Sequence, residues 1–178
     1  MFDLLKTAGA DRIMSVDLHA AQSQGFFDGP VDHLIAMPVL VDYIRDRFSN
    51  QLDNVAVVSP DAGRIRVAEQ WAQRLGGGPL AFVHKTRDIT RPNQAVANRV
   101  VGDVEGKDCV LVDDLIDTAG TIAGACSVLK DAGAKSVTVV ATHGVLSGPA
   151  VERLKNSGAA KSCLPTPCRF LKRSVGTV

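Results

Sequence analysis

The sequence predicts an α/β protein with three layers, α/β/α, around a mainly parallel sheet. Two observations predict this fold class. Short β-branched runs alternate along the chain with longer helical patterns. The runs, such as VAVVS at residues 55–59, are apolar at almost every position, which is typical of strands buried on both faces. Helices between such strands cover both faces of a parallel sheet.

The predicted elements follow in chain order. Each strand is a short apolar run, and the last three helices each run into glycine, a common residue after a helix end. We expect strands over residues 12–17, 55–59, 80–84, 110–113 and 136–142. We expect helices over residues 39–48, 63–75, 121–132 and 148–156.

Two segments depart from this rhythm. Residues 85–94, KTRDITRPNQ, are nearly devoid of apolar side chains and predict an exposed loop. From residue 159 onward the periodicity is lost. We therefore expect one domain over residues 1–158, followed by an irregular tail over residues 159–178.

The composition is that of a globular domain. The chain has 178 residues, of which 46% are hydrophobic, and 20 Lys and Arg balance 19 Asp and Glu. A net charge of +1 gives no basic surface for nucleic acid, and no apolar stretch approaches the ~20 residues of a membrane span. The first ten residues lack a signal-peptide pattern. Cys109 and Cys126 lie in apolar segments, so we expect buried thiols and a reducing cytoplasm.

The strongest local signal is CVLVDDLIDTAGT at residues 109–121. An apolar strand runs into Asp113 and Asp114, and small residues and threonines open a helix after Asp117. Backbone N–H groups at a helix start favour a phosphate. Adjacent carboxylates repel by about 4 kcal/mol at ~4 Å and an effective dielectric of ~20, so they call for a cation, a diol or water. We expect a phosphorylated-sugar site; a capped helix with a solvated acidic turn is the alternative.

A second signal is SVDLHA at residues 15–20. Asp17 and His19 are two residues apart at a strand end, so we expect them to point to the same side. Carboxylate and imidazole are metal ligands, and beside phosphates the expected ion is Mg²⁺. Asp28 and Asp32 follow as further acids. A hydrogen-bonded structural histidine is the alternative for His19.

Two more strand ends carry charged residues. Asp61 follows a buried strand and precedes a helix, so it is either an N-cap or a metal ligand. Lys85 and Arg87 come just after another strand, where cations could neutralise a phosphoryl group in transfer; a solvated basic loop is the alternative. We expect Trp71 in the core, and the sequence gives no partner for His33.

Five motifs in order carry a family resemblance. VLVDDLIDTAGT resembles the phosphoribosyl-pyrophosphate-binding signature shared by type I phosphoribosyltransferases and ribose-phosphate pyrophosphokinases. The other four are similar to ribose-phosphate pyrophosphokinases specifically: VDLHAAQSQGFFDGPVDHL, VVSPDAG, HKTR and THGVLSGPA. The resemblance implies a type I phosphoribosyltransferase-like fold.

The resemblance also implies an activity and a metal. The family uses Mg²⁺ to transfer pyrophosphate from ATP to ribose 5-phosphate, and the product, 5-phosphoribosyl 1-pyrophosphate, feeds nucleotide biosynthesis. His19 and Asp17 match the metal motif, with His19 the expected direct ligand. Asp28 and Asp32 match the family's acidic loop. Asp61 matches a second, or water-mediated, metal position.

The remaining matches concern catalysis and the sugar phosphate. Lys85 matches the catalytic lysine, and Arg87 matches the loop arginine that acts with it and contacts substrate. Asp113 and Asp114 match the acids that hold the ribose hydroxyls. The loop that cradles the 5-phosphate matches Asp117, Thr118, Ala119, Gly120 and Thr121.

The chain also departs from the family. Members run to roughly twice this length as two similar domains, so we expect a carboxyl-terminal half with reduced or no turnover, from an enzyme that forms homo-oligomers. Arg64 stands where many members have a second glycine. A type I phosphoribosyltransferase is one alternative, but that class does not need His19 or Lys85. A non-catalytic synthetase-associated subunit is the other, and retention of these residues argues against it.

Overall fold

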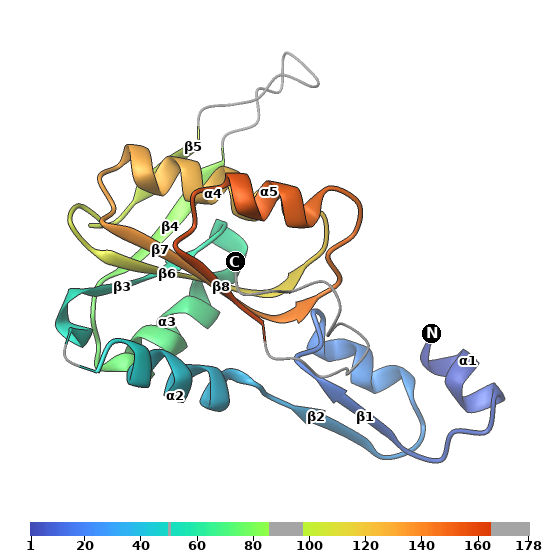
Figure 1. The fold of residues 1–178 in the computed structure, drawn as a ribbon. Coiled ribbons are helices and arrows are strands. Elements are labelled where there is room, and N and C mark those ends of the chain that lie inside the picture. The colour runs from blue at the N-terminus through green and yellow to red at the C-terminus, as the bar shows by residue number, and fades with distance from the viewer. Residues whose placement is uncertain (50, 86–97, 165–178) are drawn as a thin grey trace.

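The computed structural model describes residues 1–49, 51–85 and 98–164. Its main feature is a six-stranded sheet in the order β5-β4-β3-β6-β7-β8 (Figure 1). Neighbouring strands are parallel except β4 and β5, so the predicted mainly parallel sheet is confirmed. The strands are β3 (Val55–Ser59), β4 (Leu80–Lys85), β5 (Asn98–Val101), β6 (Asp108–Ile116), β7 (Ser136–Gly144) and β8 (Lys161–Cys163).

Helices cover both faces of this sheet, which confirms the three-layer prediction (Figure 1). One face packs against α2 (Met37–Arg47) and α3 (Ile65–Leu75), and the other against α4 (Gly120–Asp131) and α5 (Ala150–Asn156). Successive β3 residues alternate between the two cores because side chains along a strand alternate in direction. Trp71 lies in the α2–α3 core, as expected. Each predicted helix is present, with its start shifted by one or two residues.

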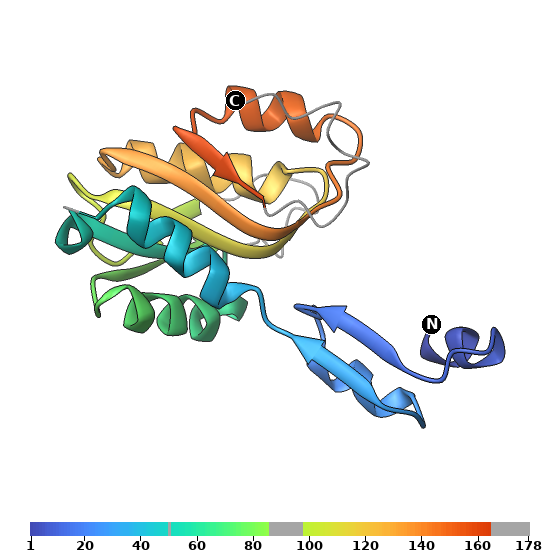
Figure 2. The ribbon, with the colours of Figure 1, turned by 60° about the horizontal axis from the view of Figure 1, so that its bottom comes forward.

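A separate two-stranded sheet lies outside the three layers (Figure 2). It pairs β1 (Ile13–Val16) with β2 (Val31–Leu34) in parallel, flanked by α1 (Phe2–Thr7) and the 3₁₀ helix η1 (Ala21–Phe26). The strand predicted over residues 12–17 is therefore present, but it does not join the main sheet. Its side chains alternate between half-buried and exposed, unlike the fully buried β3. We name this part of the chain, residues 1–35, the β1–β2 unit.

The expected irregular tail is only partly correct. Lys161–Cys163 form β8, which pairs with β7 and extends the sheet. This strand is too short and too polar to stand out as an apolar run. Residues 165–178 of that tail lie outside the described residues, as do residues 86–94 of the predicted loop.

The core confirms the expectation of buried thiols. Cys109 and Cys126 are free and buried, and burial raises the pKa of the Cys109 thiol to about 12. Within the described ranges, no helix has both the length and the apolar character needed to span a membrane.

The parallel sheet fixes where the site can form. The carboxyl ends of β3, β6 and β7 meet at one edge, which is where ligands bind in sheets of this kind. After β3 comes the short 3₁₀ helix η3 (Ala62–Arg64), and after β6 comes the start of α4. We call the segments at this edge, residues 59–64, 113–121 and 142–149, the rim.

Candidate active site

The end of β6 carries an acid pair, Asp113 and Asp114. The strand is buried up to Val112, and the two carboxylates follow where burial decreases. The backbone N–H of Asp114 donates to Asp113 Oδ1 over 2.9 Å. Burial, assisted by the neighbouring Asp114 carboxylate, raises the pKa of Asp113 to about 7. Burial also opposes ionisation of Asp114, but Asp113, Arg64 and His19 outweigh it, and the Asp114 pKa is lowered.

Arg64 lies over this acid pair. Its Nη2 donates to Asp114 Oδ2, and its Nε lies 3.6 Å from Asp113 Oδ1. The Arg64 side chain is only 19% exposed, so its charge is held close to both carboxylates. The sequence singled out Arg64 only as a departure from a family pattern. Its place in a strand-end loop, three residues after Asp61, is the signal that could have placed it at the rim.

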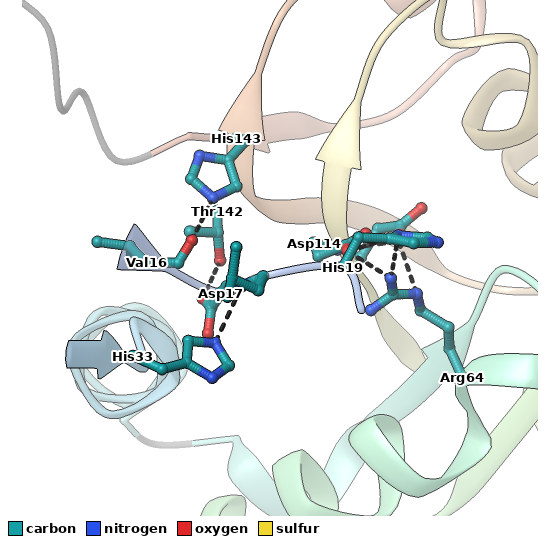
Figure 3. Close-up of polar contacts among 10 residues, drawn as sticks. Val16, Asp17, His19, His33, Arg64, Asp114, Thr142 and His143 are labelled. Atoms are coloured by element: carbon teal, nitrogen blue, oxygen red, sulfur yellow. Dashed lines mark hydrogen bonds and ion pairs between the residues drawn. The ribbon is translucent and has the colours of Figure 1, made fainter. Parts of the chain in front are cut away.

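His19 joins the same cluster from the β1–β2 unit. Its Nδ1 lies 2.9 Å from Asp114 Oδ2 and 2.7 Å from Arg64 Nη2 (Figure 3). The His19 side chain is 77% exposed, and Nε2 has no hydrogen-bond partner among the residues that the structure describes. One ring nitrogen therefore faces the acid pair, and the other is left for a further group.

Asp17 does not share this environment. It has a φ of +43°, which ends the alternation of β1 and turns its side chain away from His19. The Asp17 carboxylate accepts a hydrogen bond from Thr142 Oγ1 at 2.6 Å (Figure 3). It also accepts one from the Ala36 backbone N–H at 3.2 Å. The expectation that Asp17 and His19 point to the same side is therefore wrong. Asp17 connects the end of β1 to the end of β7 and to the chain before α2.

Two more histidines hold the segment that carries His19. The ring of His143 contacts the Val16 carbonyl oxygen through Nε2 at 2.7 Å. His33 Nε2 accepts a hydrogen bond from the Leu18 backbone N–H at 2.9 Å, and its Nδ1 lies 3.2 Å from Gln24 Nε2, so the partners that the sequence could not give are a backbone group and a glutamine. Because His143 lies near the end of β7, its contact with Val16 fixes the β1–β2 unit against the rim, whereas the His33 contact holds the segment within the unit.

The remaining predicted metal acids are dispersed. Asp28 forms an ion pair with Lys6, and Asp32 forms one with Arg12 at 2.6 Å; these partners lower the pKa of both carboxyls. Asp61 Oδ1 accepts from the Gly63 backbone N–H at 2.9 Å, which is the N-cap alternative. Within residues 1–49, 51–85 and 98–164, no three His, Cys, Asp or Glu side chains cluster closely enough to hold a metal by themselves.

The predicted phosphate loop lies between β6 and α4. Asp117, Thr118, Gly120 and Thr121 are exposed, and Ala119 is buried with a φ of +59°. Such a conformation is uncommon for alanine. A left-handed residue in a turn is one of the arrangements in which backbone N–H groups form an anion-binding concavity.

The segment after β7 supports this loop from behind. The Ser147 N–H donates to the Asp117 carbonyl, and Arg153 Nη1 donates to the Thr118 carbonyl, both at 3.0 Å. The loop backbone is therefore fixed while its side chains remain available to solvent. Lys85 ends β4 at the same edge, and Arg87 lies outside the described residues.

A mainly parallel sheet with an acid pair and a helix start at its rim is shared by a family of proteins. The phosphoribosyl transferase domain matches residues 32–164, most of the chain, and the chain belongs to that family. A purine phosphoribosyltransferase from Pyrococcus horikoshii, 20% identical over 78% of this chain and 83% of its own, has the same fold with a TM-score of 0.52.

Two relatives are more specific. Ribose-phosphate pyrophosphokinase from Bifidobacterium longum is 92% identical over 92% of this chain and 48% of its own length. The crystal structure of phosphoribosylpyrophosphate synthetase from Mycobacterium smegmatis has a TM-score of 0.87 and 54% identity, covering 98% of this chain and 55% of that one. The family resemblance seen in the motifs is confirmed. The chain spans about half the length of the curated relatives it matches.

Proposed function

We propose that the chain forms the ribose 5-phosphate-binding half of a ribose-phosphate pyrophosphokinase. In that reaction the anomeric hydroxyl oxygen of ribose 5-phosphate bonds to the β-phosphorus of ATP and loses its proton. The bond from the β-phosphorus to the α–β bridging oxygen breaks, AMP leaves, and 5-phosphoribosyl 1-pyrophosphate forms. Because the chain spans about half the length of its relatives, we expect weak or no turnover from it alone.

The observation that carries this proposal is the junction of β6 and α4. There the acid pair lies directly before the exposed residues Asp117, Thr118, Gly120 and Thr121. Carboxylate oxygens accept hydrogen bonds from ribose hydroxyls, while N–H groups and hydroxyls at a helix start bind a phosphate. A single ligand that offers a diol and a phosphate satisfies both halves of the junction.

The donor set at the rim fits Mg²⁺ only in part. His19 offers Nε2, and Mg²⁺ commonly takes few protein ligands and completes its shell with water and substrate oxygens. Asp61 is the second candidate, directly or through water. Bound Mg²⁺ would neutralise charge on phosphate oxygens. Lys85 and Arg87 are proposed to supply positive charge to the transferred group, and Arg87 also to contact substrate.

The remaining expectations become part of this proposal. Asp17 stands in the family's metal motif, but its carboxylate already has two donors, so we propose it as a support for His19 rather than a ligand. Asp28 and Asp32 lie in ion pairs, so neither supports the proposal as a metal ligand. The free, buried thiols of Cys109 and Cys126 agree with a reducing cytoplasm.

Calorimetric titration with ribose 5-phosphate, with and without Mg²⁺, tests the proposal. We expect saturable binding by the wild-type chain and a loss of about tenfold or more in affinity for Asp114→Asn, because that change removes a charged acceptor. Asp131→Asn, an exposed aspartate at the end of α4, is the matched control and should bind normally.

Two results would contradict the proposal. One is the absence of ribose 5-phosphate binding by a folded wild-type chain. The other is release of pyrophosphate when 5-phosphoribosyl 1-pyrophosphate and a purine or pyrimidine base are added, because that reaction belongs to a phosphoribosyltransferase.

A further inference from the structure

We propose that Arg64 is a positioning residue and the internal counter-ion of the acid pair. It orients both carboxylates for ribose hydroxyls and keeps divalent cations off them. The identity of the sugar rests on the proposed function; the counter-ion role rests on contacts within the chain.

The topology brings Arg64 to the acid pair. Strands β3 and β6 are neighbours in the sheet, with Val58 opposite Leu111, so the segments that follow them lie side by side. Arg64 ends η3 on one segment, and the acid pair lies on the other. The three side chains are 19%, 14% and 10% exposed. Little water therefore screens the ion pairs, and the guanidinium acts on both carboxylates at once.

The contacts of Arg64 and His19 use one oxygen of each carboxylate and leave the other oxygen free of both side chains. Within the described ranges, the hydrogen bonds and ion pairs of Asp113 involve Oδ1, and those of Asp114 involve Oδ2. Neither Arg64 nor His19 contacts Asp113 Oδ2 or Asp114 Oδ1, although the two carboxyl groups lie close enough to share a hydrogen bond with each other. A vicinal diol donates two hydrogen bonds and needs two nearby acceptors. A ribose can therefore bind these oxygens while Arg64 stays in place.

The same contacts work against a metal at this position. Arg64 Nη2 donates a hydrogen bond to Asp114 Oδ2 and lies 2.7 Å from His19 Nδ1. A cation bound between these side chains would need the same oxygen and nitrogen as ligands. Arg64 thus gives the acid pair and His19 different ligands. The acid pair is kept for hydroxyls, and His19 is left to meet a cation through Nε2.

Direct titration with Mg²⁺, in the absence of any sugar or nucleotide, tests the counter-ion role. Arg64→Gln should bind Mg²⁺ about tenfold more tightly than wild type, because it exposes the acid pair to cations. Adding Asp114→Asn to Arg64→Gln should abolish that gain. Arg66→Gln is the matched control: it makes the same change of charge two residues along, at an exposed position of α3, and should behave as wild type.

Titration with ribose 5-phosphate tests the orienting role. Arg64→Gln should bind it about tenfold more weakly than Arg66→Gln. Arg64→Lys keeps the charge without the fork, so it should keep Mg²⁺ binding weak yet bind the sugar less tightly than wild type. This variant also serves if Arg64→Gln proves unfolded by circular dichroism.

Three results would overturn the inference. The first is that Arg64→Gln binds Mg²⁺ with the same affinity as Arg66→Gln. The second is that the gain in Mg²⁺ affinity remains when Asp114→Asn is added to Arg64→Gln. The third is that Arg64→Lys binds both Mg²⁺ and ribose 5-phosphate as wild type does. A wild-type chain that fails to bind ribose 5-phosphate would count against the proposed function, while the Mg²⁺ titrations would still decide the counter-ion role.

Discussion

Asp17 and His19 illustrate how much one residue's role depends on its surroundings. Both are ordinary metal-ligand types, and both stand in one short motif. The structure gives Asp17 two donors, one of them Thr142, 125 residues further along the chain. Neither that partner nor the positive φ of Asp17 can be read from local sequence. The His19–Arg64–Asp114 contacts are equally long-range, and for this reason the sequence predicted the acids but not their counter-ion.

The contact between Thr142 and Asp17 predicts a loss of stability. Thr142→Val leaves the half-buried Asp17 carboxylate with one donor fewer and should lower the free energy of unfolding by about 1–3 kcal/mol in urea denaturation. Hydrogen exchange at the Leu18 amide should become faster, because the 16–19 segment loses a support.

Thr138 on the same strand supplies the control. It is fully buried, and its hydroxyl has no hydrogen-bond partner among the described residues. Thr138→Val should therefore leave the free energy of unfolding unchanged or raise it. Equal destabilisation by the two substitutions would mean that the Asp17 contact contributes nothing.

Within the main sheet, the strands that the sequence predicted are the inner ones, which have a neighbour on each side. Strands β3, β4, β6 and β7 and their helices follow from apolar runs and glycine ends. The edge strands β5 and β8 escaped prediction, because an edge strand has a neighbour on one side only and needs no continuous apolar run. The β1–β2 pair was half predicted: β1 was expected as a strand, but β2 has only four residues, two of them polar, and no apolar run.

The turn after β5 requires glycine at position 102. Gly102 has a φ of +116°, and an added Cβ would lie 2.7 Å from the Leu80 carbonyl oxygen and 2.7 Å from Ala81 Cβ. Gly102→Ala should lower the free energy of unfolding by more than about 2 kcal/mol through backbone strain and this clash. Gly106→Ala is the control, because Gly106 also has a positive φ, +66°, but open space around it, and its cost should be about 1 kcal/mol. Equal costs in thermal unfolding would contradict the role of crowding.

At the end of the sheet opposite the rim, Asp108 at the start of β6 forms hydrogen bonds with residues at or next to the starts of β3 and β7. Burial opposes ionisation of this carboxyl, but hydrogen bonds from Ser136, Lys135 and Asn54 outweigh it and hold the pKa below its ordinary 3.8. A lowered folded-state pKa stabilises the fold above pH 3.8, and that stabilisation is lost as the pH falls through the folded-state pKa.

The Asp108 contacts therefore predict a pH dependence. Asp108→Asn should lower the free energy of unfolding by about 1–3 kcal/mol at neutral pH, and its difference from wild type should shrink in acid below the ordinary pKa. Asp103→Asn, at an exposed position near the end of β5, should show neither effect. A difference from wild type that stays constant with pH would contradict an ionised Asp108 in the folded state.

At the scale of the molecule, the β1–β2 unit carries most of the exposed large apolar side chains among the residues that the structure describes. A two-stranded sheet is marginal by itself, and apolar clusters on a surface mark contacts with other chains. These side chains are Met1, Leu4, Leu5, Met14, Val16, Phe26, Leu34 and Ile35. We therefore propose that the chain self-associates through this unit.

Sedimentation velocity tests that association. Wild type should show concentration-dependent association, and Phe26→Asp should weaken it, because Phe26 is 70% exposed on the unit. Val39→Asp changes an equally exposed residue, 70%, on α2 and should have less effect. A wild-type chain that stays monomeric at all concentrations would contradict the prediction.

The place of the site was predictable at this scale, although its detailed contacts were not. A parallel sheet gathers its strand ends at one edge, so Asp61 and Asp113–Thr121 could be assigned to one rim from element order alone. How the β1–β2 unit docks there depends on His143 and Thr142, whose partners Val16 and Asp17 lie far away in the sequence.

The central claim is that the β6–α4 junction binds ribose 5-phosphate. Amide chemical-shift mapping of the ¹⁵N-labelled chain during titration with ribose 5-phosphate tests it most directly. We expect the largest saturable shifts at residues 113–121, with smaller ones around Arg64 and His19. Saturable shifts confined to other parts of the molecule, such as the surface between α4 and α5 around Lys130 and Asn156, would contradict the claim.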